Sequence, residues 1–255
     1  MAAHWKGMIS ILNNSLGPLG VSRAVGVPID LTDGLVGYWK MDGDVNDSSG
    51  LDQHGTTTGS PTFGSDYIEL NGSSQYITLP SNICDPYSQG SIAAWMYIED
   101  SGTAFDEMAI FSYADTASRN YKCFFRVRTE GAGLGCNIGF FLRRSNSSNQ
   151  VSGNTAFGTV SRQTWHHVGV SQDGVTGLRF WVDGSEVAVD TVNQTGNAQL
   201  THWFAINASA AERPAIGAVL DSGVTGFFKG RLKHVRLYSR PLDGVEWAAL
   251  SNGGI

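Results

Sequence analysis

Short runs of apolar and aromatic residues, each ended by glycine, asparagine, aspartate or serine, follow one another from about Gly34 to the C-terminus. Runs of about four to eight such residues between turn-forming residues are typical of β-strands. Polar and apolar positions alternate most clearly in Gly177–Val182 and Arg231–Tyr238, as in strands with one solvated face. Several other runs are apolar on both faces, which favours two packed sheets. The pattern predicts an all-β fold: a two-sheet antiparallel β-sandwich, or jelly roll.

Turn dipeptides and one capping residue refine this prediction. Asn71-Gly72 and Asp183-Gly184 are strong signals for tight hairpin turns. Leu242–Leu250, with Asp243 near its start, is the one short helix that we expect, close to the C-terminus. The expected strands are Leu35–Met41, Tyr67–Leu70, Gln75–Leu79, Ser91–Ile98, Met108–Tyr113, Tyr121–Arg128, Asn137–Arg143, Trp165–Ser171, Leu178–Val182, Glu186–Val192, His202–Ile206, Pro214–Val219 and Gly226–Tyr238.

Charge and hydropathy limit the classes of partner that this chain is expected to bind. The 255 residues include 17 Lys and Arg against 23 Asp and Glu, for a net charge of -6. An acidic chain has no general attraction for nucleic acid or for anionic membranes. No apolar run approaches the roughly 20 residues that span a bilayer, and the N-terminus lacks the apolar core of a signal peptide. We therefore expect a protein made in the cytoplasm, with no nucleic-acid partner and no membrane insertion.

Residues 1–33 differ from the rest and are predicted to form an extended arm ahead of a single sandwich domain at 34–255. Gly17-Pro18 and Val27-Pro28 interrupt the arm, and no period of 2 or 3.6 persists in it. Free termini are usually disordered unless something ties them down, so an arm with apolar side chains is expected to dock onto a protein surface. The residues expected to dock are Trp5, Ile9, Ile11, Leu12, Leu16 and Val25.

Five motifs in a fixed order carry a family resemblance. They are Gly34–Gly43 with the loop Asn46–Gly50, the segment Tyr67–Leu79, the strand Ser91–Met96, the pair Trp165–Val170 and Leu178–Gly184, and the closing segment Phe228–Leu242. Together they resemble the laminin-G-like branch of the concanavalin A-like lectin/glucanase superfamily, over roughly Gly34–Leu250. The resemblance implies a jelly roll. That superfamily includes lectin-like modules, adhesion domains, structural parts and a few hydrolases, so fold alone does not imply function.

The loop after the first expected strand is a candidate calcium site. It concentrates the oxygen ligands that a hard cation requires. Modules that it resembles often add an aspartate from the closing strand, where this chain has Lys233 and His234. An ammonium group there would repel a cation and could pair with Asp42 or Asp47 instead. Calcium as a cofactor and a solvated turn therefore both stay open. The candidate ligands are Asp42, Asp44, Asn46, Asp47 and His54.

A glycan site would need exposed aromatic faces flanked by amide and carboxylate side chains. The candidate residues are Tyr113, Asp115, Arg119, Asn120, Trp203 and Asn207. The alternative is that these aromatic residues belong to the core or to a subunit contact. His166 and His167 are neighbours in an expected strand and point to opposite faces, so they cannot chelate one metal together. With Trp165, they are expected to serve packing.

Catalytic signatures are weak. The paired carboxylates of a glucanase strand and a G-x-S-x-G elbow are both missing from the sequence, so we expect no enzyme and rank a glycoside hydrolase last. The first hypothesis is a structural or adhesion subunit on a bacteriophage virion, as decoration, fibre or receptor-contacting part. The arm would dock it onto other subunits, either in a homo-oligomer or in a particle shell or tail. The alternative is a lectin-like carbohydrate-binding module, with a cell-surface glycan as ligand and an extracellular location.

Overall fold

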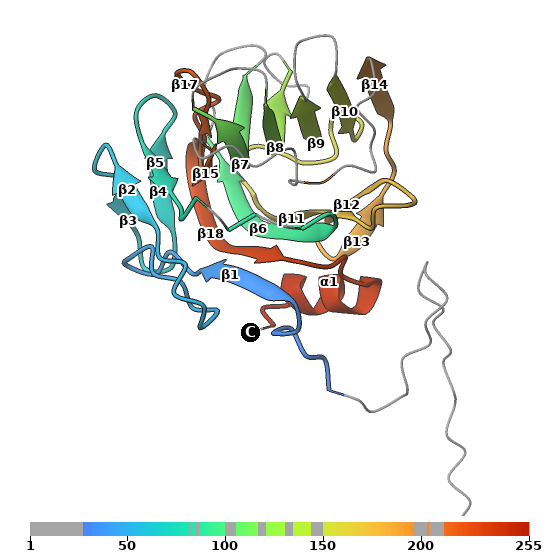
Figure 1. Cartoon of the computed structure of the whole chain (residues 1–255), viewed down its shortest axis with the longest axis horizontal. Coiled ribbons are helices and arrows are strands. Elements are labelled where there is room, and N and C mark those ends of the chain that lie inside the picture. The colour runs from blue at the N-terminus through green and yellow to red at the C-terminus, as the bar shows by residue number, and fades with distance from the viewer. Residues whose placement is uncertain are drawn as a thin grey trace, which may run out of the picture.

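A computed structural model of the protein describes residues 28–81, 83–84, 87–99, 106–116, 121–130, 135–143, 150–195, 203 and 212–254. These residues form two antiparallel sheets packed face to face, which confirms the predicted jelly-roll sandwich (Figure 1). None of their helices is long and apolar enough to cross a membrane. The six arm residues lie outside the described part of the chain, so the docking arm stays a prediction.

We call the two sheets A and B. Sheet A runs in spatial order through β13 (Ser185–Val187), β12 (Leu178–Val182), β11 (Trp165–Gln172), β6 (Gly90–Ile98), β18 (Lys229–Tyr238), β4 (Ile68–Asn71) and β3 (Thr62–Phe63), and β1 (Leu35–Trp39) also pairs with β18. Sheet B runs through β14 (Thr191–Thr195), β10 (Gln150–Asn154), β9 (Cys136–Arg143), β8 (Lys122–Thr129), β7 (Glu107–Asp115), β15 (Glu212–Ile216), β5 (Tyr76–Thr78) and β2 (Thr56–Thr58).

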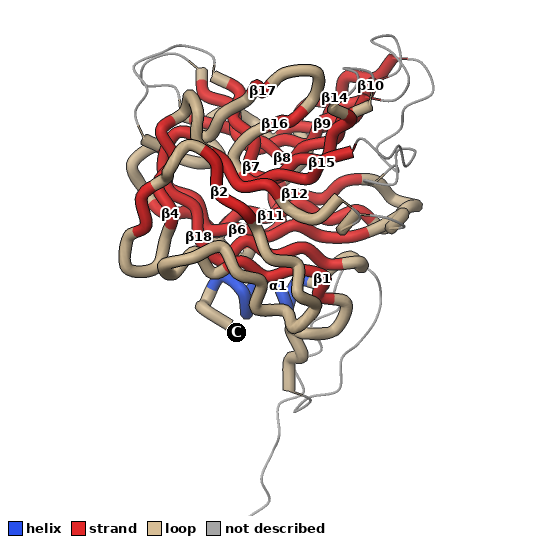
Figure 2. Tube along the Cα trace, turned by 60° about the vertical axis from the view of Figure 1, so that its left-hand side comes forward, coloured by secondary structure: helices blue, strands red, loops and turns tan. Residues whose placement is uncertain are grey.

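Two smaller elements cover the outer faces of the sandwich. The helix α1 (Gly244–Ser251) lies outside sheet A, and the hairpin of β16 (Val219–Leu220) and β17 (Val224–Thr225) lies outside sheet B (Figures 1 and 2). The helix confirms the prediction for Leu242–Leu250 and begins two residues later. Its N-cap, Asp243, accepts hydrogen bonds from the backbone N–H groups of Val245 and Glu246, at 2.9 Å each.

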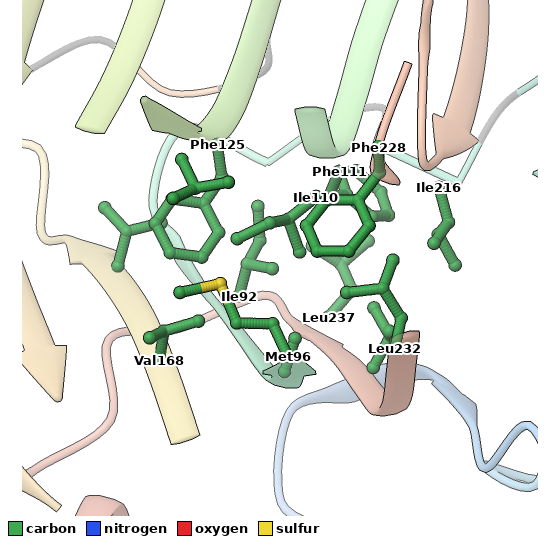
Figure 3. Packing of buried hydrophobic residues seen from close by; sticks show 14 of the residues in the cluster. Ile92, Met96, Ile110, Phe111, Phe125, Val168, Ile216, Phe228, Leu232 and Leu237 are labelled. Carbon is green, nitrogen blue, oxygen red and sulfur yellow. The ribbon is translucent and has the colours of Figure 1, made fainter. Parts of the chain in front are cut away.

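The core lies between the sheets. Ile92 and Met96 of β6 and Leu232 of β18 point toward Phe111 and Phe125 of sheet B, and all five side chains are fully buried (Figure 3). Each such side chain contributes about 1.5 to 3 kcal/mol by leaving water. Because neighbouring residues of a strand point to opposite faces, burying these positions fixes which side chains stand on the outer faces.

A second apolar cluster ties the chain ends to sheet A. Trp247 of α1 stacks on Trp181, with ring centroids 5.5 Å apart. Gly169 provides the space for the Trp247 ring, since a Cβ at residue 169 would lie 2.1 Å from it. Leu31 is buried in this cluster, and the Tyr238 hydroxyl donates to its carbonyl at 3.1 Å. Leu31, together with Asp33, which pairs with Arg240 at 2.8 Å, therefore attaches the end of the predicted arm to the sandwich, while residues 28–30 are exposed.

Strand β18 contains a β-bulge. His234 has a left-handed φ of +50°, and the pairing with β6 shifts between Lys233 and Arg236. The backbone N–H of His234 donates to the Lys40 carbonyl at 3.2 Å, and its Nδ1 lies 2.8 Å from the Tyr38 hydroxyl. Before the bulge β18 pairs with β4, and after it with β1.

The expected hairpin at Asn71-Gly72 is wrong. β4 belongs to sheet A and β5 to sheet B, so the turn carries the chain between sheets. The Asn71 side-chain oxygen accepts from the N–H groups of Ser73 and Ser74, which stabilises the turn without pairing the strands. In contrast, Asp183 and Gly184 have φ of +49° and +80° and join β12 to β13, as predicted.

The expected strand Glu186–Val192 divides into β13 and β14, which lie in different sheets, and β10 was not expected at all. The expected strand His202–Ile206 falls outside the described residues, except for Trp203.

Candidate functional site

Asp47 anchors the loop proposed for calcium. One carboxylate oxygen accepts from the N–H groups of Tyr38 and Ser49, at 2.8 and 2.9 Å. The other accepts from the Ser49 hydroxyl at 2.6 Å and from the Gln53 N–H at 3.0 Å. Burial alone would raise the pKa of Asp47, but these hydrogen bonds lower it below its ordinary value. The carboxylate already has a full set of donors from its own loop.

The remaining calcium candidates do not converge on Asp47. Asp44 accepts from the backbone and side-chain N–H groups of Asn46, at 2.9 and 2.6 Å, and Asp42 is exposed. The His54 ring accepts from the Asp47 N–H at 3.1 Å. Among the described residues, no three His, Cys, Asp or Glu side chains gather as a metal site.

The expected pairing of Lys233 with Asp42 or Asp47 is wrong. The Lys233 ammonium lies 2.6 Å from Asp66. Asp66 stands just before β4, which pairs with the first half of β18, so it lies nearer to Lys233 than the loop does. This hydrogen bond lowers the pKa of Asp66.

The aromatic residues proposed for glycan binding lie in the core. Tyr113 is 0% exposed and Trp203 is 2% exposed, with Trp203 stacked on Phe140 at 5.4 Å, and the neighbouring Asp115 is only 6% exposed. A buried ring offers no face to a sugar, so the core alternative holds for Tyr113 and Trp203. Arg119, Asn120 and Asn207 lie outside the described residues.

A different set of aromatic side chains stands on the outer face of sheet A. We call it the aromatic face: Tyr67 before β4, Trp95 and Tyr97 on β6, and Trp165 on β11. All four are half-buried. Strand register brings them together, because Trp165 pairs with Tyr97 across β11 and β6. Ring centroids of Trp165 lie 5.8 Å from Tyr97 and 6.0 Å from Tyr67.

Two cations of β18 hold these rings in place. The Arg231 guanidinium lies 5.0 Å from the Tyr67 centroid and 5.1 Å from that of Tyr97, and the Lys233 ammonium lies 4.7 Å from Trp165. Arg231 is held in turn by Glu69 at 2.9 Å. Rings fixed in this way lose little freedom when a ligand stacks on them.

His167 marks the boundary between the aromatic face and α1. Its ring is fully buried between Trp95 and Trp247, at centroid distances of 5.4 and 6.0 Å, and neither ring nitrogen has a hydrogen-bond partner. Burial, chiefly, together with Arg236 and His234, lowers the pKa of His167 to about 3, and Asp183 opposes this shift. The imidazole is therefore neutral and acts as an apolar ring.

Ser161, His166 and Asp183 align like a hydrolytic triad. The Ser161 hydroxyl lies 2.9 Å from Nε2 of His166, whose Nδ1 lies 2.8 Å from the Asp183 carboxylate. The Ser161 backbone N–H, however, also points at Nε2, at 3.2 Å. A serine nucleophile normally contributes that N–H to the oxyanion hole. The three side chains therefore hold the loop before β11 to the β12–β13 turn.

Comparison with known proteins shows which family this sandwich belongs to. Residues 71–246 match the family described as concanavalin A-like lectin/glucanases superfamily. The chain belongs to this superfamily. The matched segment includes β6, β11 and β18, which carry most of the aromatic face, and leaves out the loop of Asp42–Gly50. No curated protein matches the chain.

Solved structures show the same fold at low identity. The botulinum neurotoxin serotype C1 binding domain has a TM-score of 0.63 and 13% identity, covering 88% of this chain and 53% of that one. Domain 4 of AbnA, a GH43 extracellular arabinanase from Geobacillus stearothermophilus in complex with arabinotriose, has a TM-score of 0.60 and 19% identity, covering 85% and 98%. The binding domain of botulinum neurotoxin DC in complex with rat synaptotagmin II has a TM-score of 0.63 and 12% identity, covering 88% and 52%. The chain thus spans about half of each neurotoxin binding domain.

The aromatic face was missed at the level of sequence, where Trp165 was assigned to packing. One signal could have found it: in β6, Trp95 and Tyr97 occupy the positions opposite to Ala94 and Met96, which are buried in the core. Large aromatic residues at the outward positions of a strand that is already buried on its inner side indicate a second function for that face.

Chelation tests the calcium prediction. Because both Asp47 oxygens already accept two hydrogen bonds each, we expect the same melting temperature in calcium chloride and in EDTA. A cation bound only to the native state would raise the melting temperature. Differential scanning calorimetry makes the measurement, and a melting temperature that falls on adding EDTA and recovers with excess calcium would establish the metal site.

His167 makes stability depend on pH. Its pKa is 6.5 in an unfolded chain and about 3 in the folded protein, so between these values the unfolded state holds more protons. Stability should decline as pH falls through this range, by at most about 1.4 kcal/mol per pH unit from this one group. His167→Phe keeps a ring and removes the titration, so its free energy of unfolding should fall less steeply. Urea unfolding across this pH range tests this, and equal slopes would contradict it.

Proposed function

We propose that the chain is a non-catalytic adhesion module that binds carbohydrate through the aromatic face of sheet A. The observation that carries this proposal is the row of half-buried rings, Tyr67, Trp165 and Tyr97, held about 6 Å apart on a rigid sheet. Sugar rings present apolar C–H faces that stack on aromatic side chains, while charged neighbours fix their hydroxyl groups. Glu69, Glu99 and Asp66 stand beside the rings and can accept such hydrogen bonds.

Relatives support this assignment. The arabinanase domain is described in complex with arabinotriose, and the neurotoxin structures are described as binding domains, one of them with synaptotagmin II. Those ligands belong to those proteins. What transfers to this chain as a proposal is the use of a concanavalin A-like sandwich as a recognition surface.

Two features speak for binding without catalysis. Glu69 and Glu99, the carboxylates beside the aromatic face, both lie against Arg231, at 2.9 and 3.9 Å. Both carboxylates are thus held by one guanidinium, whereas a glycosidase sets its two carboxyl groups on either side of the scissile bond. In the Ser161–His166–Asp183 alignment, the serine backbone N–H donates to the histidine ring and is not available to an oxyanion.

We place the module on the surface of a larger particle, a bacteriophage virion, with residues 1–27 as the docking segment and an extracellular location as the alternative. The proposal rests on the apolar, interrupted sequence of the arm. Leu31 and Tyr238 fix the start of the sandwich near α1, so a docking segment would leave the domain beside this helix.

Glycan-array screening, followed by calorimetry with the best ligand and with arabinan oligosaccharides, tests the binding proposal. Trp165→Ala and Tyr97→Ala should each weaken binding about tenfold or more, because each removes a stacking surface worth about 1.4 kcal/mol.

Phe157→Ala is the matched control. Phe157 is half-buried beside Arg128 and belongs to the loop between β10 and β11, away from the aromatic face. It should leave the affinity unchanged, and melting temperatures of all three variants check folding. Binding that survives both substitutions on the aromatic face would refute this site.

A truncated chain that begins at Pro28 tests the docking segment. It keeps Leu31 in its cluster, so we expect a melting temperature like that of the full chain and loss of oligomerisation or particle association. Sedimentation of both chains, alone and with the assembled particle, makes the comparison. Unchanged association would remove the docking role from residues 1–27.

A further inference from the structure

The outer face of sheet B carries a row of cations that strand register lines up. Arg213 of β15 pairs with Ala114 of β7, Ala114 with Lys122 of β8, and Lys122 with Arg143 of β9. Paired residues of neighbouring strands point to the same face, and the strands stand about 4.8 Å apart. We call Arg213, Lys122 and Arg143 the cationic row. It crosses the strands over a span of about 15 Å.

The charge of this face contrasts with that of the whole chain. Its outward positions and covering hairpin carry five described cations, Lys122, Arg126, Arg128, Arg143 and Arg213, against two described carboxylates, Glu107 and Asp221. The chain as a whole has a net charge of -6. A local excess of cations on an acidic protein attracts an anionic ligand to that face alone.

Each cation of the row is positioned differently. Lys122 pairs with the buried carboxylate of Asp221 at 2.9 Å, which fixes the β16–β17 hairpin over the sheet. Arg143 lies over the Phe141 ring at 5.6 Å and donates to the Gln150 side chain at 3.2 Å. Arg213 is exposed and forms no ion pair or hydrogen bond with any other described residue. Its guanidinium can therefore donate two hydrogen bonds to one carboxylate.

A groove opens at the Arg213 end of the row. It has a volume of about 300 Å³ and lies between Tyr76 and Thr78 of β5, Arg213, and the turn of the β16–β17 hairpin, where the Asp221 carboxylate is already paired with Lys122. This size is near the lower end of ligand pockets. Tyr76 is half-buried and packs on Phe227, with centroids 6.2 Å apart, so its ring is braced beside the groove.

We propose that the groove and the cationic row form a second ligand site, which binds an acidic oligosaccharide with carboxylates on its sugar units. One sugar stacks on Tyr76 and pairs its carboxylate with Arg213. The chain of sugars then passes outside the β16–β17 hairpin, which buries Ala114 between Arg213 and Lys122, and reaches Arg143. This site uses residues of sheet B and of the β16–β17 hairpin that covers it, so it is independent of the aromatic face.

A sugar fits these residues better than a nucleic acid does. A single-stranded nucleic acid needs successive aromatic platforms for its bases, whereas among the residues that line this groove Tyr76 is the only aromatic one. Beyond the groove, the half-buried Phe141 ring lies under the Arg143 guanidinium, and hydroxyl and amide groups stand at the two ends of the row, at Thr78 and Gln150. Such groups suit the hydroxyls of a sugar.

Calorimetry with trigalacturonic acid at low salt tests the proposal, with its methyl ester as the uncharged match and a short thymidine oligonucleotide as a second anion. We expect the acid to bind and the ester to bind at least tenfold more weakly. Added sodium chloride should weaken the binding of the acid. Arg213→Gln and Arg143→Gln should each reduce the affinity for the acid about tenfold.

Arg179→Gln is the control, because it removes one positive charge from sheet A. It should leave the affinity for the acid unchanged. The proposal fails if the acid does not bind, if the ester binds equally well, or if the oligonucleotide binds as tightly as the acid. It also fails if Arg179→Gln weakens binding as much as Arg213→Gln. None of these results bears on neutral glycans at the aromatic face, which the earlier variants test separately.

Discussion

Much of sheet A depends on the bulge in β18. Leu232, Val235 and Leu237 point into the core, while Lys233 and Arg236 are paired with Trp95 and Ala93 of β6, whose side chains face outward. Strict alternation cannot place residues 232 and 235 on one face; the extra residue, His234, with its left-handed φ, makes this arrangement fit. At the bulge, β18 also changes its pairing partner from β4 to β1. The cations that hold the aromatic rings therefore stand where they do because one residue interrupts the ladder.

Local signals explain how much of the fold could be predicted from the sequence. Period-two runs and the Asp183-Gly184 turn depend on neighbouring residues, and these predictions are confirmed. The pairing of β4 and β5 could not be predicted in the same way. Asn71-Gly72 does form a turn, but a dipeptide determines only its own backbone angles, and which strands lie next to each other depends on contacts far along the chain. The division of Glu186–Val192 between two sheets has the same cause.

The sites were harder to predict because side-chain direction decides them. Tyr113 has polar neighbours in the sequence, yet a register shift between Ala109 and Phe111 in β7 sets its ring inside the sandwich. The aromatic face draws on four segments, and the cationic row on β15, β8 and β9. Strand register assembles each of them. The sequence lists these side chains but does not show the register of the strands that carry them. The strands of the aromatic face were therefore predicted correctly, while the wrong aromatic residues were chosen for the site.

The two outer faces of the sandwich would recognise ligands by different physics. On sheet A, the charges beside the rings are largely neutralised by one another: Arg231 by Glu69, and Lys233 by Asp66. Affinity there must come from stacking and desolvation, which salt affects little. On sheet B, Arg213 has no described partner to neutralise it, and affinity must come from charge, which salt screens over about 10 Å. A module with both faces could hold one glycan by its neutral units and another by its acidic ones, because two sheets packed about 10 Å apart turn their outer faces to opposite sides and keep the two sites sterically separate.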